Sequence, residues 1–124
     1  MIIAGLGGFL GTCGRFAVNK CCALFWSLPF PLSTFIVNIV GCFLFGLFGG
    51  IFEKSNILTP AQSLLLITGF CGGFTTFSTF AGEVFSLGAK GEWSVSALYL
   101  LLSILAGVVM VWLGRLTVKS LMAG

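Results

Sequence analysis

Two phenylalanines in the second half of the chain, Phe77 and Phe80, are spaced so that their rings share one face of a helix. Ser78 and Thr79 lie between them and supply neutral hydroxyl groups. The edge of a phenyl ring carries partial positive charge, so ring edges turned into a narrow pore can receive a small anion without a cation that would trap it. Phenylalanine in an apolar segment also commonly faces lipid or a packed core, and the chain contains 14 of them. The pair alone leaves both interpretations open.

Other neutral polar side chains lie inside apolar stretches. Asn38 falls within an uncharged stretch, where an amide is costly unless it is hydrogen-bonded, so it marks a packing contact or a pathway. Tyr99, Ser103 and Gly107 recur every four residues and form a stripe of hydroxyl groups and a small residue on one helix face. Such a stripe is typical either of helix packing or of a polar pathway.

The segment before the two phenylalanines is rich in glycine and threonine, at Gly69, Gly72, Gly73, Thr75 and Thr76. Each glycine weakens a helix by about 1 kcal/mol relative to alanine, and threonine hydroxyls compete for backbone hydrogen bonds. A break here would leave carbonyl groups that suit a cation at the end of one half-helix, and N–H groups at the start of the next. The glycines can instead allow close packing of an unbroken helix, and composition favours neither interpretation.

Two charged residues, Arg15 and Glu83, lie well within reach of the apolar stretches. A charge inside a membrane segment is a candidate functional group. Arg15 is expected either to attract anions or to tie helix ends together. Glu83 is expected to line a vestibule or to lie at an interface, and neither residue is assigned a contact with an ion.

The composition predicts that the elements carrying these residues lie in a membrane. Of 124 residues, 58% are hydrophobic and only 7% are charged, whereas a soluble domain has about 25% charged residues. A bilayer core of about 30 Å requires a helix of about 20 apolar residues. We predict a single all-α domain, residues 1–124, with four transmembrane helices at about residues 2–24, 33–52, 60–87 and 93–116. The apolar start lacks a basic leader, so we expect it to belong to the first helix rather than to a signal peptide.

The expected connections are short and place both termini on one side of the membrane. They lie at about residues 25–32, 53–59 and 88–92, and Thr59 followed by Pro60 is a helix-start signal. The basic residues divide almost evenly between the two sides: Lys54, Arg115 and Lys119 against Lys20, Lys90 and the nearby Arg15. The positive-inside rule needs an asymmetry to fix orientation. We therefore expect insertion in both orientations and pairing with an inverted copy; the alternative is that one extra charge or an assembly factor decides.

Several other classes of protein fit the sequence poorly. The five cysteines form no CxxC pair and the chain has no histidine, which argues against a zinc or haem site and favours cysteine as a small packing residue over a thiol oxidoreductase. No nucleophile–base pair, phosphate loop or basic patch indicates an enzyme or a nucleic-acid partner. A small multidrug antiporter needs an acid in its first span, where this chain has Arg15 and no acid before Glu53. A structural or assembly subunit is the remaining rival.

Three segments of the sequence resemble the fluoride-exporting channel family, Fluc, also called CrcB. They are residues 7–15 in the first span, 34–41 in the second and 69–80 in the third. The third contains TTFSTF after a GxCGG pattern, which is far more specific than a glycine pattern alone. The resemblance extends over essentially the whole chain.

The resemblance implies a passive, fluoride-selective channel that exports fluoride from the cytoplasm through the bacterial inner membrane and lowers its toxicity. It implies an antiparallel, dual-topology homodimer in lipid, with two pores along its interface. The residues that it places on the fluoride pathway are Asn38, Phe77, Thr79, Phe80, Tyr99 and Ser103. It also implies a third helix that is broken near its middle, and a structural sodium ion at the dimer centre, held at this break by main-chain carbonyls of Gly72 and Thr75 from each subunit.

Overall fold

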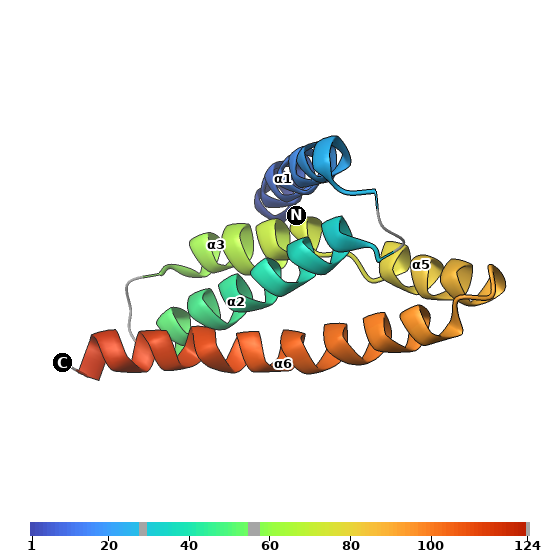
Figure 1. Ribbon diagram of the computed structural model, residues 1–124. Coiled ribbons are helices and arrows are strands. Elements are labelled where there is room, and N and C mark those ends of the chain that lie inside the picture. Colours follow the sequence, from blue (N-terminus) through green and yellow to red (C-terminus); the bar gives the residue numbers. More distant parts are fainter. Residues whose placement is uncertain (28–29, 55–57, 124) are drawn as a thin grey trace.

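All elements of the computed structural model are helical (Figure 1). They are α1 (Ile2–Phe25), α2 (Leu32–Lys54), α3 (Pro60–Ser63), the π-helix η1 (Leu64–Cys71), α4 (Gly72–Phe74), α5 (Ser78–Ala89) and α6 (Trp93–Ala123). The structure describes residues 1–27, 30–54 and 58–123. Residues 28–29 and 55–57, which belong to two of the expected connections, and residue 124 lie outside the described residues.

Four helical segments of the described chain are long and apolar enough to cross a membrane: Ile2–Phe25, Leu32–Glu53, Pro60–Ala89 and Trp93–Leu121. Many large apolar side chains, such as Phe9, Phe16 and Leu105, are exposed on the surface of the single chain. Such a surface suits acyl chains better than water. The prediction of an all-helical protein with four membrane-spanning helices is therefore confirmed.

The start of the third span has the helix cap that the sequence predicts. The hydroxyl of Thr59 accepts a hydrogen bond from the N–H of Gln62 at 3.1 Å, and the Gln62 side chain accepts one from the N–H of Thr59 at 3.0 Å. Pro60 occupies the first helical turn, where its missing N–H is not needed. This reciprocal capping box satisfies two N–H groups of the helix end.

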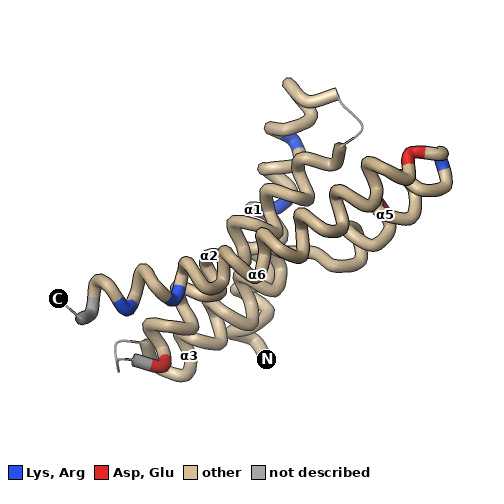
Figure 2. The backbone as a smooth tube through the Cα atoms, turned by 60° about the horizontal axis from the view of Figure 1, so that its bottom comes forward, with Lys and Arg blue, Asp and Glu red and all other residues tan. Residues whose placement is uncertain are grey.

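Most charged residues lie toward the ends of the helix assembly (Figure 2). At the end that holds the C-terminus, Arg115 binds Glu53 with two hydrogen bonds, of 2.6 and 2.9 Å. This ion pair joins the end of α2 to α6. At the other end, Lys90 and Glu92 lie between α5 and α6. The distribution matches a protein whose middle lies in the bilayer core.

Glycines form the closest contacts between helices. The most extensive pairing joins α2 to α6, and a Cβ atom added at Gly114 would lie 2.7 Å from the backbone nitrogen of Leu47. The second pairing joins α1 to η1 and α4. There, a Cβ at Gly73 would lie 2.6 Å from the carbonyl oxygen of Gly8. At both pairings glycines thus let the helix backbones come into direct contact, as small residues do between membrane helices.

The third span is interrupted after its first half, as the family resemblance implies, but the break lies beyond the glycines. Gly69 belongs to the π-helix and Gly72 and Gly73 to α4, whereas Thr75 is extended, with φ −80° and ψ 159°. Helix α5 then begins at Ser78. A Cβ at Gly69 would lie only 2.8 Å from the Cα of Gly7. The two sequence interpretations therefore apply to different residues: the glycines allow close packing, and the residues after them form the break.

Gly11→Ala should destabilise the protein by about 1–3 kcal/mol, the usual effect of overpacking. A Cβ at Gly11 would lie 2.7 Å from the backbone nitrogen of Phe74 and would overlap the carbonyl oxygen of Phe70. These are backbone atoms, which move only if α1 moves away from the broken segment. Thermal unfolding of the purified protein in detergent measures the effect. Gly5→Ala is the matched control, because nothing lies within 4 Å of its added Cβ; equal midpoints for both variants would contradict the packing argument.

Candidate functional site

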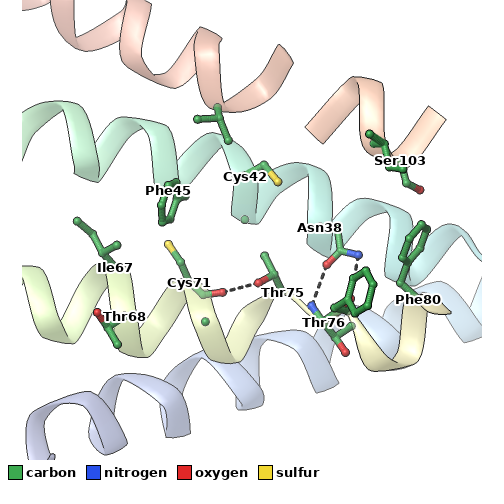
Figure 3. Close-up of a pocket in the computed structure, with 15 residues that line it drawn as sticks. Asn38, Cys42, Phe45, Ile67, Thr68, Cys71, Thr75, Thr76, Phe80 and Ser103 are labelled. Carbon is green, nitrogen blue, oxygen red and sulfur yellow. Dashed lines mark hydrogen bonds between the residues drawn. The ribbon is translucent and has the colours of Figure 1, made fainter. Parts of the chain in front are cut away.

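A groove of about 550 Å³ follows the broken third span and is bordered by α2 and α6 (Figure 3). None of its described lining residues is charged, and none comes from α1. The polar side chains that line it are those of Asn38, Thr68, Thr75, Thr76 and Ser103. The groove is thus a neutral, partly polar surface between membrane-spanning helices.

Asn38 binds the backbone at the break through both polar atoms of its amide (Figure 3). Its Nδ2 donates to the carbonyl of Thr76 at 3.1 Å, and its Oδ1 accepts from the N–H of the same residue at 2.9 Å. An amide nitrogen carries two hydrogens, so the second N–H of Asn38 is not used by this contact. Asn38 therefore holds the broken segment and also lines the groove, as both of its sequence interpretations would require.

Phe77 and Phe80 both line the groove, but their surroundings differ. The Phe80 side chain is 7% exposed, whereas that of Phe77 is 78% exposed. Their ring centroids are 6.1 Å apart with an interplanar angle of 53°. Phe80 also packs edge-on against Tyr99, with centroids 5.0 Å apart. The chain itself thus fixes the Phe80 ring and leaves that of Phe77 open on its surface.

The stripe on the fourth span divides into three environments. Tyr99 is fully buried, and its hydroxyl donates to Oε1 of Glu83 at 3.0 Å. Ser103 lines the groove, and its buried hydroxyl has no hydrogen-bond partner among the described residues. Gly107 packs against α2, because a Cβ there would lie 3.3 Å from the sulfur of Cys42. Of the residues predicted for the pathway, Tyr99 is not among those that line the groove, and neither is the exposed Thr79.

Several carbonyl groups at the break, among them those of Gly72 and Thr75, accept no hydrogen bond recorded for the described residues. The last turn of a helix leaves its carbonyls without intrahelical donors. The carbonyl of Cys71 accepts from the N–H of Thr75 at 3.0 Å and from its hydroxyl at 2.8 Å. That of Gly73 accepts from Arg15. Those of Gly72 and Thr75 have no such donor among the residues that the structure describes, and both residues line the groove.

The chemistry of this pair suits a hard cation. Neutral carbonyl oxygens are ligands that such ions accept, and they occur in backbone form in ion-selective sites. Two oxygens are too few to replace the hydration of a cation, so one chain supplies only part of a coordination shell. The described residues hold no cluster of histidine, cysteine or carboxylate groups that would favour a transition metal.

The two intramembrane charges have partners that sequence patterns do not predict. Nε of Arg15 donates to the carbonyl of Gly73 at 3.1 Å, which joins α1 to the end of α4. Glu83 accepts the Tyr99 hydrogen bond, so it lies against α6. Thr76, which the sequence analysis placed in the threonine-rich segment but not on the pathway, contributes its backbone to Asn38, and its hydroxyl accepts a long bond of 3.4 Å from the N–H of Thr79. An amide inside a membrane needs a hydrogen-bond partner, so Asn38 was the residue in the sequence that indicated a contact of this kind.

These features define a small multi-pass membrane protein with an uncharged, largely apolar groove that carries a few neutral polar groups at a helix break, an arrangement typical of proteins that pass ions or small polar solutes. The sequence matches the family described as CrcB-like protein, Camphor Resistance (CrcB), over residues 2–115. The chain belongs to this family, which confirms the resemblance drawn from its motifs.

Several curated relatives share the name fluoride-specific ion channel FluC. The protein of Azobacteroides pseudotrichonymphae is 42% identical over 114 residues, which cover 92% of this chain and 91% of the relative. That of Chlorobium phaeobacteroides is 42% identical over 119 residues, 96% of this chain and 92% of the relative. The FluC 1 protein of Bacillus cereus is 44% identical over 114 residues, 91% of this chain and 82% of the relative.

Proposed function

We propose that the chain is a fluoride-selective ion channel that lets fluoride leave the cytoplasm passively through the bacterial inner membrane. The observation that carries this proposal is the uncharged groove, where Phe77, Phe80 and the unpartnered hydroxyl of Ser103 lie along a break in a membrane span. The names of the relatives support fluoride as the transported ion. No enzymatic reaction is proposed for a member of a family whose relatives are named ion channels.

The groups in the groove suit the chemistry of fluoride. This ion is small and strongly hydrated, so its entry requires hydrogen-bond donors that replace water. The hydroxyl of Ser103 and the unused N–H of Asn38 are such donors, and the edges of Phe77 and Phe80 add positive potential. No ammonium or guanidinium group lines the groove within the described chain, so no group there would hold the anion too tightly for passage.

Tyr99 and Thr79 belong to the proposed pathway on different grounds. Tyr99 lies beside Phe80, with ring centroids 5.0 Å apart, so an ion that reaches Phe80 comes close to Tyr99. Thr79 lies between the two phenylalanines in sequence and is exposed on the single chain. Its hydroxyl is proposed to act as a further neutral donor.

The proposal includes a homodimer with an inverted copy of the chain. The groove is open along one side of the single chain, and a second chain of the same composition would close it with apolar and neutral polar groups. The near balance of basic residues between the two ends supports insertion in both orientations. In such a dimer Phe77, whose ring is open on the single chain, would be covered by the partner.

A sodium ion at the centre of this dimer would take the free carbonyls. Gly72 and Thr75 of each chain would together offer four carbonyl oxygens, the kind of ligand that a hard cation takes. Bound there, the ion would supply positive charge and hold the two broken spans together. The ion is proposed as a structural group and not as a transported one.

A liposome efflux experiment tests the proposed function. Purified full-length protein in vesicles loaded with fluoride should release the ion rapidly when a potassium ionophore balances the charge, as measured with a fluoride electrode. Chloride should leave hardly at all, and a pH gradient should not drive the flux. Proton-coupled flux would favour a small antiporter, and no flux would favour a structural subunit; either result, or equal flux of both halides, contradicts the proposal.

The proposed orientation is tested separately. A tag at either terminus should be accessible from both sides of the membrane in comparable amounts, because the basic residues give little bias. Accessibility from one side only would contradict the inverted dimer without contradicting fluoride transport.

A further inference from the structure

Arg15 is a charged side chain of α1 that reaches the end of the first half of the broken span. Its Nε donates to the carbonyl of Gly73 at 3.1 Å, a contact between residues 58 positions apart in sequence. The side chain is partly buried. The ion pair that the structure records among the described residues joins Arg115 to Glu53, so Arg15 has no carboxylate partner there.

A guanidinium within a membrane span needs a group that offsets its charge. The C-terminal end of a helix carries partial negative charge on its free carbonyls, and a cation placed there is stabilised. The end of α4, at Phe74, provides such a place. The contact with Gly73 therefore stabilises the charge of Arg15 and also gives a carbonyl at the helix end a hydrogen bond.

The contact also constrains the carbonyls of Gly72 and Thr75. Peptide groups are planar, so holding the carbonyl of Gly73 fixes the orientation of the peptide that joins it to Phe74. Gly72 precedes this peptide and Thr75 follows it. On the far side of the break, Asn38 fixes the backbone of Thr76. Side chains from two other helices thus hold the backbone beside these carbonyls, Arg15 at Gly73 between them and Asn38 at Thr76 just after them.

Arg15 acts from outside the groove. No residue of α1 is among the described residues that line it, and α1 packs against η1 and α4 through glycines that allow the backbones to touch. A cation in the groove and the guanidinium of Arg15 would therefore contact different carbonyls of the same turn. The positive charge of Arg15 is not placed among the groups that would bind the ion.

We propose that Arg15 is a positioning residue for the candidate cation site. By taking the carbonyl of Gly73, it keeps the carbonyls of Gly72 and Thr75 available to a hard monovalent cation in the groove. This proposal rests on the proposed function and on its sodium ion, and it assigns Arg15 no contact with either ion.

The test measures how sodium stabilises the purified full-length protein in detergent. The thermal midpoint of the wild type should rise with sodium concentration when N-methylglucamine keeps the ionic strength constant. In Arg15→Met the sodium dissociation constant fitted from this rise should increase by roughly tenfold, the factor expected for losing a hydrogen bond to a charged group. A purely structural loss would lower the midpoint equally with and without sodium, so the concentration dependence separates the two.

Two further variants keep the test decisive. Lys20→Gln removes a positive charge from the same helix at a residue that contacts the ring of Phe16 and lies outside the groove; its sodium dependence should match that of the wild type. Arg15→Lys keeps a charged donor and should restore most of the sodium effect if Arg15→Met folds poorly. A wild-type dependence in both Arg15 variants would overturn the proposal.

Fluoride efflux, measured in parallel, separates this proposal from the function on which it rests. A wild type that passes fluoride but gains no stability from sodium would overturn the positioning role and leave the channel intact. A wild type that passes no fluoride would instead contradict the proposed function, whatever sodium does to its thermal midpoint.

Discussion

Asn38→Ala should reduce fluoride efflux by at least about 100-fold, since it removes two hydrogen bonds worth roughly tenfold each. The variant loses the donor to the carbonyl of Thr76 and the acceptor for its N–H, at 3.1 and 2.9 Å. Both backbone groups would then be unpaired at the break, and the segment that carries Phe77 would lose its attachment to α2. The groove would also lose an amide donor. The liposome assay with a fluoride electrode measures the effect.

Cys42→Ala is the matched control for Asn38→Ala. Cys42 lies one helical turn further along α2 and lines the same groove, yet its thiol makes no hydrogen bond among those recorded for the described chain. Its flux should stay within a few-fold of the wild type. Size-exclusion chromatography should show both variants at the same elution volume. Normal fluoride flux through Asn38→Ala would remove this residue from the pathway and from the support of the break.

Phe80→Ile should also reduce fluoride flux to the level of empty vesicles. Isoleucine keeps an apolar side chain of moderate size but has no ring edge to face an anion. The ring of Phe80 is 7% exposed and packs against Tyr99, so the substitution leaves a small cavity and a stability loss of about 1–3 kcal/mol. The flux assay and thermal unfolding together separate the two effects.

Phe85→Ile is the control for Phe80→Ile. Phe85 lies on the same helix, α5, is 75% exposed and does not line the groove, so its replacement should leave the flux unchanged. Phe77→Ile adds a second comparison, because that ring is 78% exposed on the single chain and its loss disturbs little packing within it. Fluoride flux at the wild-type rate through both Phe77→Ile and Phe80→Ile would refute the role of ring edges.

The glycine-rich stretch shows why local sequence permits a break but does not determine its position. Gly72 and Gly73 weaken any helix, yet both are helical here because α1 packs against them at backbone distance. The chain leaves the helix at Thr75, where Asn38 pairs with the backbone of the next residue. Helix propensity acts within a few residues, whereas the partner that satisfies an opened backbone comes from a residue 38 positions away.

The stripe on the fourth span shows the same limit of local sequence patterns. The spacing of Tyr99, Ser103 and Gly107 correctly places them along one helix face, but one face can pass three different neighbours. Tyr99 meets Glu83, Ser103 meets the groove, and Gly107 meets α2. Periodicity specifies which residues share a direction, and only the packing of other helices specifies what lies in that direction.

The composition and the lengths of the apolar segments determined the membrane environment, the helical class and the number of spans. The bilayer requires long apolar helices of any helical chain that crosses it. The sequence motifs, which consist of residue types at fixed spacings, determined the family, because such motifs depend on the sequence alone. The position of the break, the carbonyls that remain free and the partner of Arg15 were decided only by tertiary structure. These features depend on which donors from distant helices reach the opened backbone, and no local pattern contains that information.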